Sequence, residues 1–184
     1  MPGPALLGTA YAISEIFLGI TRRSGSGTVS RDRRSLALLW IVIGSSILLA
    51  QYVLSGPLGN LPRSSFLSLT GLVLFIAGIA LRWYSIFYLG RFFTVDVAIA
   101  HKHELIDSGP YRLIRHPSYT GAILAFVGFG LSLGNWLSLL CLVLPTTAAF
   151  LWRIRVEERA LTEGLGDQYC EYVQRTKRLV PFVY

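Results

Sequence analysis

The stretch from Gly90 to Tyr119 gathers many of the side chains that could perform chemistry. It holds all three histidines of the chain, the ring pair Phe92 and Phe93, and two proline-containing turns. Loops often carry binding residues, and rings beside imidazoles and carboxylates suit a site for an aromatic, polar ligand. A solvated loop with aromatic side chains at a membrane surface would have the same composition. Composition alone leaves both interpretations open.

A metal site is the first chemistry to consider in this stretch. His101 and His103 form an H-x-H motif, and His116 and Asp96 could add a nitrogen and an oxygen ligand. The membrane di-iron oxygenase family needs many more histidines than three, so we predict no metal site. No G-x-G-x-x-G motif follows an expected strand, which argues against a dinucleotide-binding fold of the soluble type.

A second group of polar residues, R-I-R-V-E-E-R, follows the last apolar segment. Arg153 and Glu157 are four residues apart, so a helix would place these opposite charges on one face. The pair could be a salt bridge at a helix end, which stabilises a protein little. It could instead place a cation and an anion where both meet ligands, beside the histidine-rich stretch.

Composition indicates that membrane helices position these residues. Hydrophobic residues make up 53% of the 184 residues and charged ones 15%, against about 25% charged residues in an ordinary soluble domain. We expect one integral membrane domain, residues 1–184, with an all-α fold and about five transmembrane helices of ~20 residues. The apolar segments run from Pro4 to Ile20, Ser35 to Leu54, Phe66 to Leu89, Tyr119 to Leu133 and Trp136 to Trp152.

The domain is expected to have two parts. Residues 1–89 would form the N-terminal helices, and residues 90–184 the polar loop, a helical hairpin and C-terminal helices. Only Gly134 and Asn135 separate the last two apolar segments, which predicts an antiparallel hairpin. Beyond this hairpin we expect a surface helix, interrupted at Gly164 and Gly166, and a second short helix capped by Asp167.

The net charge of +7 is explained by orientation in a bilayer. Basic residues flank apolar segments and form no continuous stripe of the kind that binds nucleic acid. Five arginines follow the first apolar segment, against the single Arg63 in the next loop, which predicts a cytoplasmic first loop. Alternation then places the Gly90 to Ser118 loop and the tail after Trp152 on the cytoplasmic face. A soluble cofactor could meet a lipid-embedded partner there.

Glu15 is an ionisable residue inside the first apolar segment. Such residues are functional candidates by default. Glu15 lies only five residues before Ile20, however, and Arg82 lies in the cytoplasmic half of the third segment. We therefore expect Glu15 either to reach toward the membrane surface or to pair with Arg82.

Four ordered motifs lie between Leu89 and Phe182. They are L-I-D-S-G-P-Y-R-L-I-R-H-P-S-Y-T-G, R-I-R-V-E-E-R, G-D-Q-Y-C-E-Y and R-L-V-P-F. Together they resemble the isoprenylcysteine carboxyl methyltransferase family, over about half of the chain. The resemblance implies a membrane-embedded methyltransferase that uses S-adenosylmethionine at the cytoplasmic face without a Rossmann domain. The N-terminal helices match the family only in being hydrophobic.

The resemblance also implies roles for individual residues. Arg153 would receive the substrate carboxylate, and Glu157 matches the family's cofactor-binding glutamate. These two residues are therefore the catalytic candidates. Asp96 stands where eukaryotic members tend to have a glutamine, so it is a weaker candidate for cofactor binding. Eukaryotic members also carry extra N-terminal helices, and the compact prokaryotic branch need not methylate a prenylated protein. The cofactor-binding residues would be His103, Glu104, Leu105, Ile106, Tyr111, His116, Pro117, Ser118, Tyr119 and Glu157.

The implied reaction is methyl ester formation on a lipid-embedded, isoprenylcysteine-like carboxylate. A carboxylate is already ionised at neutral pH, so its methylation needs no general base. Catalysis would rest on positioning and desolvation, and alignment can lower a barrier by up to roughly 7–11 kcal/mol. Expected partners are membrane lipids and this substrate, and neither nucleic acid nor a metal ion.

Three other functions compete with this one. A phospholipid or other lipid N-methyltransferase shares the H-P-x-Y and E-E features. A membrane reductase that uses NADPH is the second alternative, because sterol reductases have a C-terminal arrangement broadly similar to that of this chain. A membrane scaffold or transporter subunit would use the polar loop to bind another protein.

Overall fold

The computed structural model describes residues 3–21, 33–62, 64–90 and 105–184. These residues form six α-helices and a short 3-10 helix, and their β-structure is limited to two isolated bridges. The predicted all-α fold is therefore confirmed. The elements are α1 (Pro4–Thr21), α2 (Arg33–Leu54), α3 (Ser65–Leu89), η2 (Gly109–Arg112), α4 (Pro117–Ser132), α5 (Trp136–Leu165) and α6 (Asp167–Arg175).

Four of the helices, α1, α2, α3 and α5, are long and apolar enough to cross a membrane. Many large apolar side chains on them face outward, among them Ile13, Ile41, Leu48 and Ile76, as expected where lipid is the solvent. The protein is thus an integral membrane protein. The fifth expected span, α4, has only 16 residues, about 24 Å of helix at 1.5 Å per residue.

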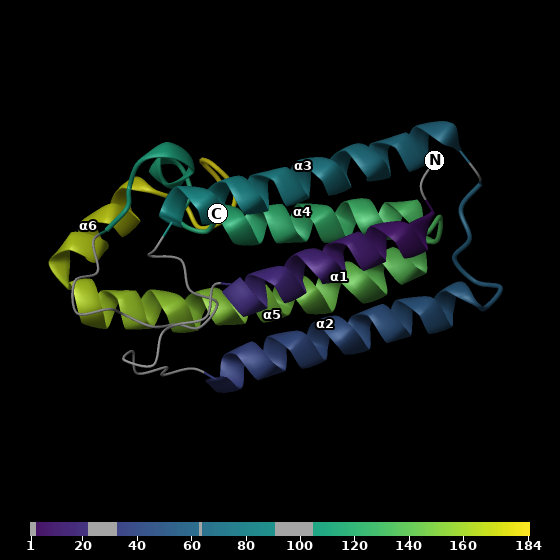
Figure 1. Ribbon diagram of the computed structural model, residues 1–184, viewed down its shortest axis with the longest axis horizontal. Coiled ribbons are helices and arrows are strands. Elements are labelled where there is room, and N and C mark those ends of the chain that lie inside the picture. Colours follow the sequence, from purple (N-terminus) through teal and green to yellow (C-terminus); the bar gives the residue numbers. More distant parts are fainter. Residues whose placement is uncertain (1–2, 22–32, 63, 91–104) are drawn as a thin grey trace.

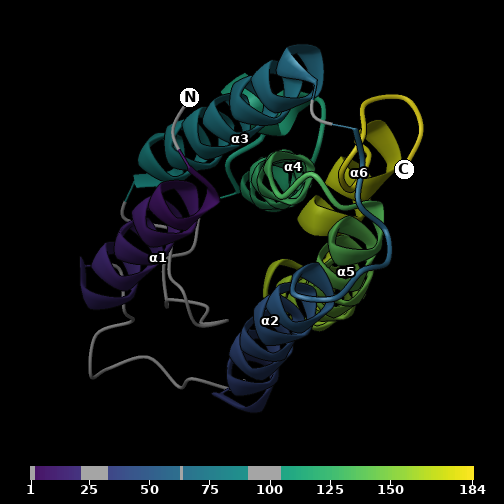
Figure 2. The same cartoon turned by 90° about the vertical axis from the view of Figure 1, so that its right-hand side faces the viewer.

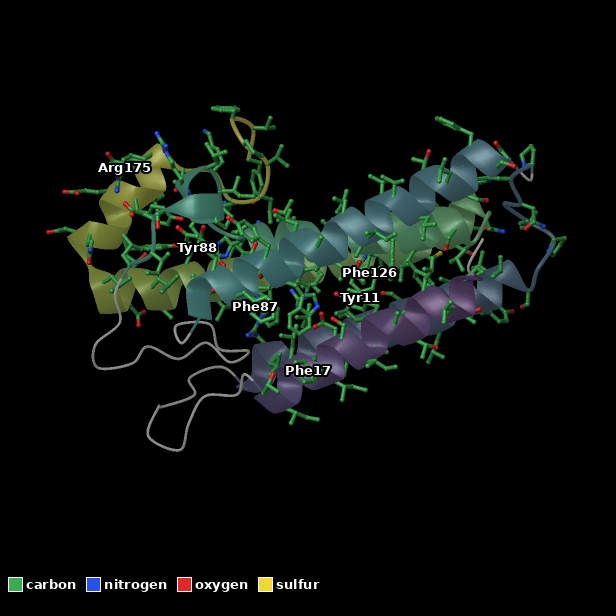
Figure 3. All side chains as sticks on the ribbon, turned by 45° about the horizontal axis from the view of Figure 1, so that its top comes forward. Tyr11, Phe17, Phe87, Tyr88, Phe126 and Arg175 are labelled. Carbon is green, nitrogen blue, oxygen red and sulfur yellow. The ribbon has the colours of Figure 1, made fainter. Side chains whose placement is uncertain are left out.

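The helices run up and down between two ends of a bundle (Figure 1). α1 and α3 end, and α2 and α4 begin, at one end, which we call the polar end because α5 and α6 extend the molecule beyond it. α4 packs between α3 and α5, and α2 packs along α5, as the end-on view shows (Figure 2). On α1, Tyr11 points toward Phe126 of α4 (Figure 3), with ring centroids 4.9 Å apart.

Glycines bring α3 and α4 into unusually close contact. A Cβ atom on Gly78 of α3 would lie 2.6 Å from the carbonyl oxygen of Gly121, and one on Gly121 would lie 2.6 Å from the carbonyl oxygen of Gly78. Gly71 and Gly128 face each other in the same way one step further along the helices. Small residues allow such approach between membrane helices, so α4 is held firmly against α3.

The predicted hairpin between the last two apolar segments is confirmed. Gly134 has a φ of 65° in the turn, and the side chain of Asn135 caps α5 by accepting a hydrogen bond from the Ser138 amide. α5 then continues unbroken through Trp152 to Leu165. The surface helix is therefore an extension of α5 in which Gly164 remains helical.

The connection to α6 differs from the expected cap. The break comes at Gly166, which has a φ of 56° and is itself the N-cap residue of α6, without a side-chain capping hydrogen bond. The prediction that Asp167 caps this helix was wrong, because the positive φ of Gly166 turns the chain and leaves Asp167 as the first helical residue.

Candidate active site

The polar end brings together the loop before α4, the extension of α5 and the C-terminal segment. The amide of Arg115 donates to the Lys177 carbonyl over 2.7 Å, and the amide of His116 donates to the Arg178 carbonyl over 3.0 Å. An isolated parallel bridge joins Ile114 to Lys177. This short pairing fixes the start of α4, and with it the H-P-S-Y motif, against the C-terminal segment.

Tyr119, in the first turn of α4, joins Arg153 and Glu157 of α5. Its hydroxyl donates to Glu157 Oε2 over 2.9 Å and accepts from Arg153 Nε over 3.2 Å. Arg153 is 2% exposed, whereas 30% of the Glu157 side chain is exposed. The two opposite charges predicted from their spacing thus meet at one hydroxyl, and the carboxylate keeps an accessible side.

His116 lies beside both glutamates at the start of α5's extension. Its Nδ1 is 3.9 Å from Glu157 Oε2, and its Nε2 is 3.4 Å from Glu158 Oε1. The imidazole stacks on the Tyr119 ring, with centroids 5.6 Å apart. His116 is also the N-cap residue of α4, where Pro117 occupies the first helical position, as suits a residue without an amide hydrogen.

Glu158 forms a cluster of ionic contacts that the sequence analysis did not predict. Glu158 Oε1 accepts from Arg115 Nε and Glu158 Oε2 accepts from Arg178 Nε, both over 2.9 Å. Arg115 also donates to the carbonyl oxygen of Thr176 over 2.5 Å. Glu158 therefore ties α5 to the loop before α4 and to the C-terminal segment. Arg115 and Arg178 belong to two of the ordered motifs, which is the signal that could have identified them.

Tyr111 connects α3 to α6. Its hydroxyl donates to the Ser85 carbonyl over 3.1 Å, and its own carbonyl accepts from the Tyr172 hydroxyl over 2.6 Å. Burial raises the pKa of both phenols above their ordinary value, so both stay protonated donors at neutral pH. Tyr111 was predicted to contact a cofactor. The structure uses its hydroxyl within the protein and leaves only its buried ring for that role.

Tyr169 of α6 has a buried hydroxyl without a hydrogen-bond partner in the described structure. Burial raises its pKa, and the negative charges of Glu158 and Glu157 raise it further, so the phenol remains a proton donor. Leaving such a group unsatisfied costs about 1–3 kcal/mol, which suits a donor that a ligand completes. Tyr169 belongs to the motif G-D-Q-Y-C-E-Y, but the motif by itself predicts no role for its hydroxyl.

The remaining predicted cofactor residues divide into two groups. His103 and Glu104 lie outside the described residues, as do His101 and Asp96 of the possible metal site. Leu105 and Ile106 are partly buried just before η2, and Pro117 and Ser118 are buried at the start of α4. Across the described ranges, no group of three metal-ligating side chains is present.

The predicted pairing of Glu15 with Arg82 is confirmed. Arg82 Nε and Nη2 donate to the two oxygens of Glu15 over 2.6 and 2.7 Å, and both side chains are buried, at 10% and 7% exposure. Arg82 Nη1 donates to the Ser118 carbonyl over 3.3 Å. The pair therefore links α1 and α3 to Ser118 in the first turn of α4, the residue that precedes Tyr119.

A family model of known proteins matches residues 66–168, with the description phospholipid methyltransferase. Among curated relatives, the chain is 38% identical over 126 residues to protein-S-isoprenylcysteine O-methyltransferase B of Arabidopsis thaliana, covering 67% of this chain and 64% of the relative. It is 32% identical over 126 residues to the protein-S-isoprenylcysteine O-methyltransferase of Homo sapiens, covering 67% of this chain and 44% of the relative.

A solved structure shows a similar fold. It is that of a eukaryotic intramembrane Ras methyltransferase, an isoprenylcysteine carboxyl methyltransferase, with a TM-score of 0.57 and 27% identity over 83% of this chain and 54% of that chain. The chain spans just under two thirds of the length of the plant relative and less than half of the human one.

Proposed function

Because the chain belongs to the isoprenylcysteine carboxyl methyltransferase family, we propose that it transfers a methyl group to the carboxylate of a lipid-embedded, isoprenylcysteine-like substrate. The observation that carries this proposal is the meeting of Arg153 and Glu157 at the Tyr119 hydroxyl. A methyltransferase needs a methyl donor, and we propose that this donor is S-adenosylmethionine.

The side chains at the polar end fit this cofactor. Glu157 offers a partly exposed carboxylate to an ammonium group, and the stacked rings of His116 and Tyr119 offer an aromatic surface. The buried Tyr169 hydroxyl is a donor in need of an acceptor. When bound, S-adenosylmethionine supplies an electrophilic methyl group on a sulfonium.

Arg153 is the group that would hold the substrate. A guanidinium binds a carboxylate with strong, charge-assisted hydrogen bonds, and its burial makes these bonds stronger than they would be in water. Tyr119 holds Arg153 Nε on one side and Glu157 on the other. The protein therefore fixes Arg153, which would bind the substrate carboxylate, relative to Glu157, which would bind the cofactor. Catalysis by alignment requires such fixed positions.

We further propose that the polar end faces the cytoplasm. The segment from Arg22 to Arg34, which includes the first two residues of α2, carries five arginines, and positive segments of this kind favour the cytoplasmic side. The first turn of α4 and the part of α5 beyond Trp152 lie at the same end of the bundle as the end of α1 and the start of α2 (Figure 1). Cofactor would then arrive from water and substrate from the bilayer.

The direct test supplies the purified, full-length protein with methyl-labelled S-adenosylmethionine and a farnesylated cysteine analogue. We expect a lipid-soluble product whose label is released by mild base, as an ester requires. Base-stable label on a phospholipid or amine would instead support the N-methyltransferase alternative, which the description of the matching family model keeps in view.

Calorimetry tests the cofactor without turnover. We expect S-adenosylhomocysteine to bind and NADPH not to bind, and Glu157→Gln to weaken binding about tenfold, since a charge-assisted bond is lost. Glu171→Gln on the exposed face of α6 is the matched control and should leave binding unchanged. Equal affinity in all three proteins would remove Glu157 from the cofactor site.

A further inference from the structure

Ser35 of α2 contacts the residue that would hold the substrate. Arg153 Nη1 donates to Ser35 Oγ over 2.7 Å, and Ser35 is 1% exposed. The two residues are 118 positions apart in the chain and meet because α2 packs along α5. Ser35 lies outside residues 66–168, the region that matches the family model, so the family motifs give it no role.

The contact constrains the guanidinium in a particular way. Tyr119 takes the Nε donor and Ser35 takes an Nη1 donor, and two bonds to different nitrogens fix the plane of a rigid guanidinium. A serine hydroxyl accepts this bond without adding a negative charge. Arg82, by contrast, places two nitrogens on the carboxylate of Glu15.

On the basis of the proposed function, we propose that Ser35 is a positioning residue that orients Arg153 toward the substrate carboxylate. The N-terminal helix α2 then completes the substrate site, although every proposed cofactor residue lies later in the chain, from His103 onward. Loss of the hydroxyl would leave Arg153 charged but without the Ser35 contact at Nη1, so the guanidinium would be held less firmly and its alignment with the carboxylate would suffer.

The test compares binding of a farnesylated cysteine analogue with binding of its methyl ester to the purified full-length protein. The wild type should prefer the free carboxylate, and Ser35→Ala should reduce that preference about five- to tenfold, because a hydrogen bond to a charged group is lost. The KM for the analogue should rise by the same factor, with the affinity for S-adenosylhomocysteine unchanged. Ser46→Ala removes another buried hydroxyl of α2, far from Arg153, and should change neither quantity.

A double variant identifies the route of the effect. If Ser35 acts through Arg153, Ser35→Ala should have no further effect on this preference in an Arg153→Ala background. Additive losses would overturn the positioning role, as would a Ser35→Ala protein that keeps the full wild-type preference. A wild type that forms no base-labile ester would overturn the proposed function itself, and that result is read from a separate assay.

Discussion

Two arginines at the polar end meet carboxylates in opposite ways. Arg82 donates hydrogen bonds directly to both oxygens of Glu15, and both side chains are buried. Arg153 and Glu157 share the Tyr119 hydroxyl, and the carboxylate remains partly exposed. The first pair satisfies its charges internally, whereas the second joins a cation and an anion through a hydroxyl and leaves part of the carboxylate accessible.

This difference separates a structural pair from a candidate site within one membrane protein. Buried charges are costly unless they are paired and hydrogen-bonded, and Glu15 with Arg82 meets that condition. The arrangement around Tyr119, in which part of the Glu157 carboxylate stays accessible, is the one proposed to bind ligands. The predictions below would break or sharpen this distinction, beginning with the largest expected effect.

Removing Glu15 from its buried pair with Arg82 should reduce the stability of the protein more than any other change considered. Glu15→Ala leaves Arg82 as an uncompensated buried charge and should lower the free energy of unfolding by about 3–5 kcal/mol, measured by denaturant titration in detergent. The double variant Glu15→Met, Arg82→Met is the control and should recover most of the loss. A loss below about 1 kcal/mol in the single variant would mean that the pair behaves like a solvated one.

Removing Arg153 should reduce turnover more than it reduces the stability of the protein. Arg153→Ala should lower kcat/KM about 100-fold, equivalent to about 2.7 kcal/mol, while the affinity for S-adenosylhomocysteine changes less than about threefold. Arg153→Lys keeps the positive charge but loses the planar guanidinium. Its kcat/KM should lie between that of the wild type and that of Arg153→Ala. Normal turnover by Arg153→Ala on the farnesylated analogue would exclude Arg153 from the reaction.

Tyr119→Phe tests the hydroxyl that joins the two charges. The ring and its stacking on His116 should persist, but the hydrogen bonds to Glu157 and Arg153 are lost. We expect kcat/KM and cofactor affinity each to fall about three- to tenfold, since each bond contributes roughly 1 kcal/mol. Ser85→Ala keeps the Tyr111 contact, which uses a backbone carbonyl, and serves as the activity control. Unchanged kinetics in Tyr119→Phe would show that the bridge has no functional role.

The smallest effect is expected at the exposed pair of Arg175 and Asp107. These side chains are 62% and 47% exposed, and their nitrogen and oxygen atoms are 3.3 Å apart. Arg175 is the last residue of α6 (Figure 3). Arg175→Ala should change the free energy of unfolding by less than about 0.5 kcal/mol, and a loss above about 2 kcal/mol would contradict the view that exposure decides what such pairs contribute.

The sequence was sufficient for features that depend on local pattern. The long apolar segments predicted α1, α2, α3 and α5, and the Gly134-Asn135 pair predicted the hairpin turn, because length, hydropathy and turn chemistry act over neighbouring residues. The spacing of Arg153 and Glu157 correctly placed them on one helix, and the motifs identified the family. The cofactor roles assigned from these motifs stay predictions.

Only the tertiary structure decided how these side chains meet. Pattern predicted an ionic relation between Arg153 and Glu157 but not the Tyr119 hydroxyl between them, nor the Ser35 contact across 118 residues. Arg115 and Arg178 meet at Glu158 for the same reason, because the C-terminal segment pairs with the loop before α4. Such contacts depend on which helices pack together and at what depth, and hydropathy and spacing along one chain carry no information about that choice.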